Sequence, residues 1–203
     1  MANSLAAIVI LAAGQSSRMR GADKLLELVS GAPLIRRQAE MALSTGLPVW
    51  IALPTNRSMR VTALHGLPVK LVIVPDAEMG LAHSIRAANA AVPSDLSLLL
   101  LLADLPDITA DDLRKLCLAA DERPNSIVRA TTDTGQPGHP IVLPASFRAR
   151  LSLLTGDQGA KEILKQHVSD TVFVALAGKR ALTDLDTPEQ WAIWRTQRPR
   201  NAD

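Results

Sequence analysis

The chain has 203 residues, 47% hydrophobic and 21% charged, and its 22 basic and 20 acidic residues leave a net charge of +2. This composition is typical of a packed globular protein and excludes a disordered chain. The near balance of charge leaves no broad basic surface for DNA or RNA, and the scarcity of aromatic residues removes a stacking platform for single strands. We therefore expect no nucleic-acid partner.

Two further features bear on the compartment. The apolar run Leu5–Ala13 has no basic flank before it and is too short to cross a bilayer, so we interpret it as a buried strand and expect no membrane association. The single cysteine, Cys117, has no partner for an internal disulfide and is interpreted as a small apolar residue on a helix. A chain without disulfides fits the reducing cytoplasm.

Short apolar runs alternate with amphipathic stretches, which predicts an α/β fold. The runs predict strands at Ala6–Leu11, Val49–Leu53, Val69–Val74, Leu98–Ala103, Ile127–Thr131 and Thr171–Leu176. The five leucines from Leu98 suit a buried helix equally well by periodicity, but the shortness of the run and the Pro106 that follows favour a central strand. We expect one domain over residues 1–203, with a mostly parallel sheet covered by helices on both faces.

Capping signals support the same alternation. Pro33 opens a predicted helix that Gly46 ends. Thr109, followed three residues later by Asp112, is typical of a helix N-cap, and Pro188 opens a last helix through Trp191 and Trp194.

The first predicted strand leads into a loop of small residues, Leu11 to Gly14, followed by Arg18 and Lys24. Small residues let backbone N–H groups approach a phosphate closely, and the two cations supply positive charge beside it. The segment has neither the Gly-Lys-Ser/Thr of a P-loop nor the G-x-G-x-x-G of a dinucleotide site. Taken alone, it is equally compatible with an ordinary strand-to-helix turn.

Acidic residues follow the most apolar strand and recur near the C-terminus. Asp104 comes directly after the leucine run, where ligands of open α/β sheets bind, so it is a candidate ligand for a cation, whereas Asp107 is favoured as a turn residue. Asp184 and Asp186 fall on one side of an extended segment and can share a metal. Asp186 can instead cap the helix opened by Pro188.

These segments together resemble the molybdenum cofactor nucleotidyltransferases, the MobA/MocA-like NTP transferase family. Leu11–Lys24 is similar to the LAAG-x-S-x-R-M…K signature, although Arg20-Gly21 stands where a glycine often follows Met19 directly. Further segments match in the same order and span nearly the whole chain, namely residues 80–85, 103–106, 138–140, 156–161 and 184–188.

The resemblance implies a three-layer Rossmann-like nucleotidyltransferase fold and a set of site residues. Lys24 and Arg18 would hold the NTP phosphates, and Asp104 would bind Mg²⁺ with Asp186 as a second ligand. The base and ribose would lie on the loop formed by Leu11, Ala12, Ala13 and Gly14. Two polar side chains, those of Ser84 and His139, would face the nucleotide or the pterin. Without the resemblance, His139 is equally compatible with a loop histidine.

The implied reaction transfers CMP from CTP to molybdopterin with release of pyrophosphate, and a molybdoenzyme apoprotein is an expected partner of the product. Ala13 points to CTP, since relatives that use GTP tend to have glycine there. The alternatives are a GTP-using guanylyltransferase of the same family, a sugar-phosphate nucleotidyltransferase or nucleotide-sugar glycosyltransferase, and a non-catalytic carrier of the cofactor. The position of the Asp184–Asp186 pair argues against a glycosyltransferase, and the retention of Arg18, Lys24 and Asp104 together disfavours a pure carrier.

Overall fold

The computed structural model describes residues 6–197, without the side chain of residue 162. The strands of the main sheet are β1 (Ala6–Leu11), β4 (Val49–Pro54), β5 (Lys70–Val74), β6 (Ser97–Leu102), β7 (Ile127–Thr131), β8 (Pro137–Leu143) and β9 (Thr171–Ala175). The helices are α1 (Leu34–Leu43), α2 (Ser58–Ala63), α3 (Leu81–Ala91), α4 (Ala110–Glu122), α5 (Arg148–Leu151), α6 (Ala160–Gln166) and α7 (Pro188–Thr196). Short 3-10 helices are η1 (Ser17–Met19), η2 (Ala77–Met79), η3 (Ala145–Phe147), η4 (Val168–Asp170) and η5 (Arg180–Leu182).

Within residues 6–197 the main sheet has seven strands in the order β5-β4-β1-β6-β8-β7-β9. All neighbouring pairs are parallel except those of β8, which runs antiparallel to both β6 and β7. The predicted mostly parallel α/β sheet is confirmed. That one domain spans residues 1–203 stays a prediction.

The sequence pattern missed β8. Its first residues are Pro137, Gly138, His139 and Pro140, with a cis peptide bond before Pro140, and prolines and glycines are depleted in strands. Pairing with β6 falls on the apolar half that follows, Ile141 to Leu143. His139, which the pattern alone left open as a loop residue, therefore lies on a strand of the sheet.

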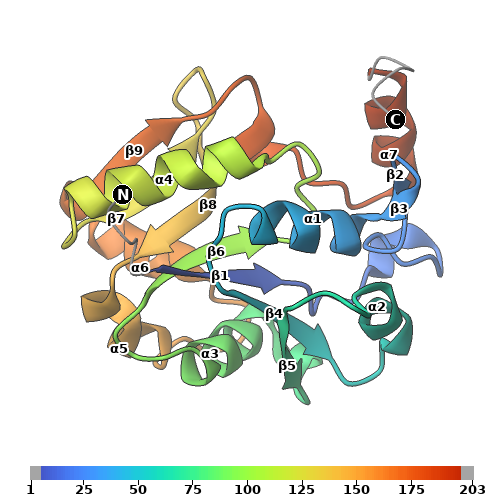
Figure 1. Cartoon of the computed structure of the whole chain (residues 1–203), viewed down its shortest axis with the longest axis horizontal. Helices are drawn as coiled ribbons and strands as arrows, with labels where there is room; N and C mark the ends of the chain where they lie inside the picture. The colour runs from blue at the N-terminus through green and yellow to red at the C-terminus, as the bar shows by residue number, and fades with distance from the viewer. Residues whose placement is uncertain (1–5, 198–203) are drawn as a thin grey trace.

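Helices cover both faces of the sheet (Figure 1). One face packs against α1, α4 and α7 in a buried cluster that includes Leu34, Leu113 and Trp191. The other packs against α3, α5 and α6 and includes Ile85 and Leu151. Alternate residues of the central strands β1, β4 and β6 enter opposite clusters, as the twofold repeat of a strand requires, and the three-layer prediction is confirmed.

The sequence signals for three helices are also confirmed. Thr109 and Asp112 form a reciprocal capping box at the start of α4, and Thr187 forms one with Gln190 at the start of α7. Pro33 ends a short hairpin of β2 (Leu28–Val29) and β3 (Ala32–Pro33) and precedes α1 directly. Among residues 6–197, no helix has the length and apolar character needed to cross a membrane.

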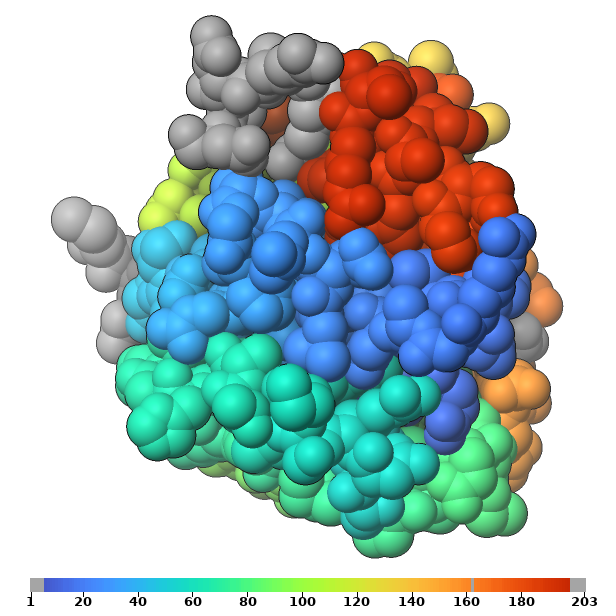
Figure 2. All heavy atoms as spheres, turned by 90° about the vertical axis from the view of Figure 1, so that its right-hand side faces the viewer, coloured from blue at the N-terminus to red at the C-terminus, as the bar shows by residue number. Residues whose placement is uncertain are grey.

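The order of the strands determines where a site can form. The chain moves from β1 to β4 and β5 on one side, and then returns through α3 to β6 on the other side of β1. The carboxyl ends of β1 and β6 thus flank the point where the strand order reverses, the usual place for a ligand in an open α/β sheet. Figure 2 looks onto this side, where N-terminal segments in blue lie between the C-terminal segment in red and the α2 to α3 region in teal and green.

Gly138 tests the packing that anchors the C-terminal segment. A Cβ built at this position would lie 2.0 Å from the carbonyl oxygen of Ala181 in η5. The carbonyl is part of the backbone, so it cannot rotate away as the end of a side chain could. We expect Gly138→Ala to lower the free energy of unfolding by about 1–3 kcal/mol, as overpacking does. Urea denaturation of the two proteins measures this difference, and an unchanged midpoint would contradict the close approach.

Candidate functional site

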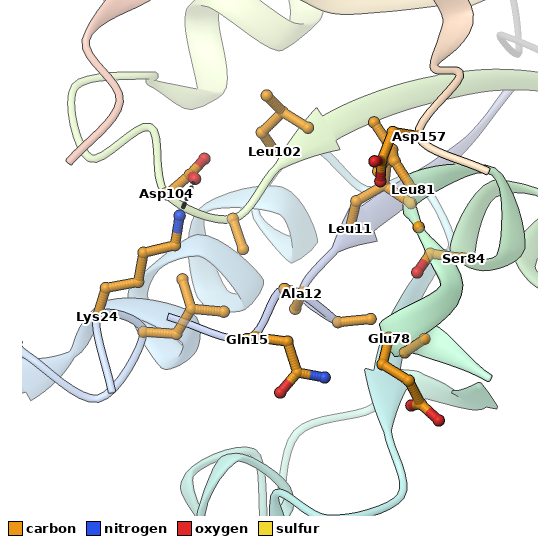
Figure 3. A pocket seen from close by; sticks show the side chains of 16 residues that line it. Leu11, Ala12, Gln15, Lys24, Glu78, Leu81, Ser84, Leu102, Asp104 and Asp157 are labelled. Carbon is orange, nitrogen blue, oxygen red and sulfur yellow. Dashed lines mark hydrogen bonds and ion pairs between the residues drawn. The ribbon is translucent and has the colours of Figure 1, made fainter. Parts of the chain in front are cut away.

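A cleft of about 290 Å³ opens at the carboxyl ends of β1 and β6. The loop after β1 forms its floor, and Lys24 and Asp104 lie on one side, opposite Leu81, Ser84 and Asp157 (Figure 3). The lining includes seven residues named from the sequence, which are Leu11, Ala12, Ala13, Gly14, Lys24, Ser84 and Asp104. Lys24 and Asp104, which are 80 residues apart in sequence, thus meet at the switch point of the sheet.

The Lys24 ammonium lies between two carboxylates. Its Nζ is 2.5 Å from Asp104 Oδ2 and 2.6 Å from Asp186 Oδ1, and all three side chains are less than 20% exposed, at 12%, 17% and 13%. Burial alone would lower the pKa of Lys24, but the two carboxylates outweigh burial and raise it. Lys24 therefore carries a fixed positive charge at the edge of the cleft.

The C-terminal segment reaches this ion pair through Asp186. The other carboxylate oxygen of Asp186 accepts a hydrogen bond of 2.6 Å from Arg18, whose side chain is 67% exposed. Neither Arg18 nor Asp186 is among the described residues that line the cleft. The cap of α7 is Thr187, so Asp186 is not the cap that the sequence allowed. The Leu185 amide donates to the Asp104 carbonyl at 3.2 Å, which holds this segment against the end of β6.

A third carboxylate adds to the negative charge. Burial raises the pKa of Asp184, and repulsion from Asp104 and Asp186 raises it further. Asp107, by contrast, turns away from this cluster and accepts hydrogen bonds from the Trp194 indole at 3.0 and 3.2 Å. Asp107 therefore anchors α7 rather than the cleft.

The carboxylates suit a hard cation that also binds phosphate. Asp104 Oδ1 is enclosed and has no hydrogen-bond partner among the described residues, which leaves one anionic oxygen unsatisfied. Residues 6–197 contain no cluster of three or more histidine, cysteine or acidic side chains arranged to hold a metal by themselves. Mg²⁺ is usually bound through one or two carboxylates together with substrate phosphates, so Asp104 and Asp186 fit that mode.

The opposite wall depends on a close approach of two glycines. A Cβ at Gly80 would lie 2.3 Å from the Gly156 carbonyl oxygen, and Gly80 has a φ of +118°, which favours glycine. The Gly156 carbonyl also accepts from the Ala82 amide at 3.0 Å. This contact places Asp157 on the same cleft wall as Ser84, which is 3% exposed in the first turn of α3.

His139 lines a second cavity, of about 250 Å³, rather than the main cleft. The two cavities share Leu11, Leu81 and Asp157, so they adjoin, and Lys161 lies on the wall of the second. His139 Nδ1 is enclosed and has no hydrogen-bond partner among the described residues. Burial and the nearby Arg129 guanidinium lower the pKa of His139 to about 4. The imidazole is therefore neutral near pH 7.

The residue that holds the floor of the cleft, Arg60, carries no signal in the sequence. Arg60 of α2 is 0% exposed and donates to the carbonyls of Ala12 and Gly14 as well as to Asp23. No local pattern distinguishes it from a surface arginine of an amphipathic helix. Only the parallel pairing of β4 with β1, which carries α2 behind the loop, brings it there.

Positive charge held over a loop that can approach phosphate suits the transfer of nucleotidyl groups, and solved nucleotidyltransferase structures have the same fold. The protein is an enzyme of the α/β nucleotidyltransferase class. The MobA-like NTP transferase domain matches residues 8–172, and the chain belongs to this family.

Two relatives cover nearly the whole chain. Nicotine blue oxidoreductase of Paenarthrobacter nicotinovorans is 29% identical over 90% of this chain and 92% of its own. Purine catabolism protein PucB of Bacillus subtilis is 28% identical over 92% and 94%, respectively. The two names point to different reactions, so they do not identify the substrate here.

Solved structures share the fold. Rv0371c of Mycobacterium tuberculosis superposes with a TM-score of 0.81 at 25% identity, covering 92% of this chain and 95% of its own. Its complex with manganese gives 0.78 at 22% identity, covering 95% and 98%. CMP:2-keto-3-deoxy-manno-octonic acid synthetase complexed with CTP gives 0.74 at 18% identity, covering 94% and 97%.

The lowered pKa of His139 predicts how stability depends on pH. The unfolded chain takes up a proton near the ordinary value of 6.5, whereas the folded imidazole resists protonation until about pH 4. Between these values the unfolded state binds more protons, so stability falls as pH is lowered, by at most about 1.4 kcal/mol per pH unit for this group. His139→Gln should remove this part of the slope. The measurement is urea unfolding of both proteins from pH 7 to 4, and parallel curves would contradict the enclosed neutral imidazole.

Proposed function

We propose that the protein transfers CMP from CTP to the phosphate of a molybdopterin-type acceptor and releases pyrophosphate. The observation that carries this proposal is the Lys24 ammonium, held between Asp104 and Asp186 at the edge of a cleft floored by Leu11 to Gly14. A largely enclosed ammonium with a raised pKa, beside a loop of small residues, is suited to the charge of a triphosphate. The supporting sequence features are the motifs shared with the molybdenum cofactor nucleotidyltransferases.

The chemistry follows from the charges involved. An acceptor phosphate oxygen attacks the α-phosphorus of CTP, a P–O bond forms, and the bond from the α-phosphorus to the bridging oxygen breaks with departure of pyrophosphate. Because the nucleophile is already an anion near neutral pH, no general base is needed. The barrier is the approach of two anions and the charge that develops on the leaving group, and Lys24 and Arg18 counter both by position and charge.

We further propose Mg²⁺ as the metal, with Asp104 and Asp186 as its protein ligands. Both offer hard anionic oxygens, and Asp104 Oδ1 is already without a protein partner in the described part of the chain. When bound, Mg²⁺ would neutralise phosphate charge and favour departure of pyrophosphate. Lys24 would then move from the carboxylates to the phosphates.

The adjoining cavity is the proposed acceptor side. Cavities of about 290 and 250 Å³ that share a wall suit a reaction with two substrates. Neutral His139 can exchange a hydrogen bond with a heterocycle, and Lys161 adds a cation for the acceptor phosphate. In this proposal Leu11, Ala12, Ala13, Gly14 and Ser84 bind the nucleotide, and the cytoplasmic product is delivered to a molybdoenzyme apoprotein.

Ala13 supports CTP over GTP. It is 3% exposed and lines the cleft. In this proposal its methyl group narrows the space beside the base, where a glycine would leave room. Pockets discriminate one methylene by only about 1–3 kcal/mol, so hydrogen bonds from the loop backbone to the base edge supply the rest of the preference.

The experiment is a product analysis with each nucleotide. The purified protein, Mg²⁺ and molybdopterin cofactor are incubated with CTP, GTP, ATP or UTP, and the product is identified by mass. We expect a cytidine dinucleotide and a kcat/KM for CTP at least about tenfold above that for GTP, with Ala13→Gly weakening this preference without reversing it.

The outcomes separate the parts of the proposal. Preference for GTP would overturn cytidylyl transfer and leave nucleotidyl transfer standing. Absence of any dinucleotide with this acceptor, while pyrophosphate is released with a sugar phosphate, would overturn the molybdopterin acceptor. Binding of the cofactor without pyrophosphate release from any NTP would indicate a carrier.

A further inference from the structure

The loop that floors the cleft is held from behind by two arginines. Arg60 donates from Nη1 to the Ala12 carbonyl at 2.5 Å and from Nη2 to the Gly14 carbonyl at 2.9 Å. Arg57, the residue before α2, donates to the Gln15 carbonyl at 2.6 Å. The guanidinium of Arg60 is fully buried, so these contacts are protected from water.

The direction of the carbonyls determines the direction of the amides. In a trans peptide the C=O and N–H groups point to opposite sides, and the peptides that follow Ala12 and Gly14 are trans. The amides of Ala13 and Gln15 therefore point away from Arg60. Both residues line the cleft, and no described residue accepts a hydrogen bond from either amide. Arg60 thus leaves two backbone donors available on the cleft side of the loop.

The same guanidinium is coupled to Lys24. Arg60 binds Asp23 through both carboxylate oxygens at 2.8 Å, and Asp23 accepts from the Ser16 hydroxyl at 3.2 Å. Ser16 Oγ in turn accepts from the Lys24 amide at 3.3 Å. Burial works to raise the pKa of Asp23, but the charge and hydrogen bonds of Arg60 lower it. The buried ion pair of Arg60 with Asp23 therefore fixes both the loop and the backbone of Lys24.

We propose that Arg60 is a positioning residue that turns the amides of Ala13 and Gln15 toward oxygen atoms of the bound nucleotide, and that Arg57 supports it by holding the next peptide of the loop through the Gln15 carbonyl. The inference rests on the proposed nucleotide-binding function of this cleft. Arg60 touches no substrate in this account. Without Arg60 the loop carbonyls would accept hydrogen bonds from water. Because they accept them from a buried guanidinium instead, the loop is held in one conformation before the nucleotide binds.

Arg148 offers a matched control. It is also buried, at 6% exposure, and donates to backbone carbonyls, including those of Val92 at 2.8 Å and Leu96 at 3.2 Å. These contacts lie beyond the C-terminal end of α3, whereas the first residues of α3, Leu81 and Ser84, line the cleft. Arg148→Lys therefore removes a similar clamp away from the nucleotide.

The test compares wild type, Arg60→Lys and Arg148→Lys by urea unfolding, calorimetric titration with Mg·CTP, and steady-state kinetics. We expect Arg60→Lys to weaken CTP binding and raise KM for CTP at least about tenfold, the equivalent of one to two hydrogen bonds. KM for the acceptor should stay unchanged. Even where Arg148→Lys lowers the free energy of unfolding as much as Arg60→Lys does, its Kd for CTP should stay within about twofold of the wild-type value. Loss of fold alone lowers the active fraction and the apparent kcat, and it does not move KM.

Each result decides the matter. Equal KM for CTP in wild type and Arg60→Lys, or an equal rise in both variants, overturns the positioning role while the proposed function stands. Failure of the wild type to bind any NTP overturns the proposed function and this inference with it. If Arg60→Lys does not fold, Arg57→Lys releases only the Gln15 carbonyl, and its KM for CTP should rise about threefold, with an unchanged value counting against the proposal.

Discussion

The ion pair of Lys24 with Asp104 and Asp186 is the interaction on which the site depends. It joins the loop after β1, the end of β6 and the segment before α7. Among the contacts of residues 6–197 described above, no other one links all three segments. Removing charges from water is costly, and the ion pair is tolerated because one ammonium contacts two carboxylates at once. The site is therefore a concentrated arrangement of charge beside a cleft of mostly small and apolar residues at the switch point of the sheet.

That arrangement has a consequence for the proposed reaction. In the ligand-free protein the Lys24 ammonium holds together the carboxylates that are the proposed metal ligands, so part of their negative charge is compensated before substrate binds. Nucleotide and metal would enter as a unit in which the phosphates attract Lys24 and the metal takes its place on the carboxylates. Arg60 does not take part in this exchange, because its partners are loop carbonyls and Asp23. In the proposed mechanism the Lys24 ammonium moves, whereas the Arg60 guanidinium keeps the floor of the cleft rigid.

Much of the fold could be predicted because its signals are local. Six apolar runs gave six of the seven strands of the described sheet, and the cap at Thr109 gave the start of α4. β8 could not be predicted because its glycine and prolines oppose strand formation, and its place between β6 and β7 is decided by pairing far along the chain. Physical reasoning placed Asp104 at a strand end, but the meeting of Lys24, Asp104 and Asp186 is a tertiary fact that only shared motifs anticipated. Arg60 had no signal of either kind.

The most direct test of the central claim is the affinity of the nucleotide-free protein for Mg²⁺, measured calorimetrically on wild type, Lys24→Met and Asp104→Asn. If Lys24 holds the place of the cation, removing its charge frees both carboxylates, and Lys24→Met should bind Mg²⁺ at least about tenfold more tightly than wild type, about 1.4 kcal/mol. Asp104→Asn should bind more weakly than wild type. Equal affinity in wild type and Lys24→Met, or undiminished binding by Asp104→Asn, would contradict a metal site shared between Asp104 and Asp186.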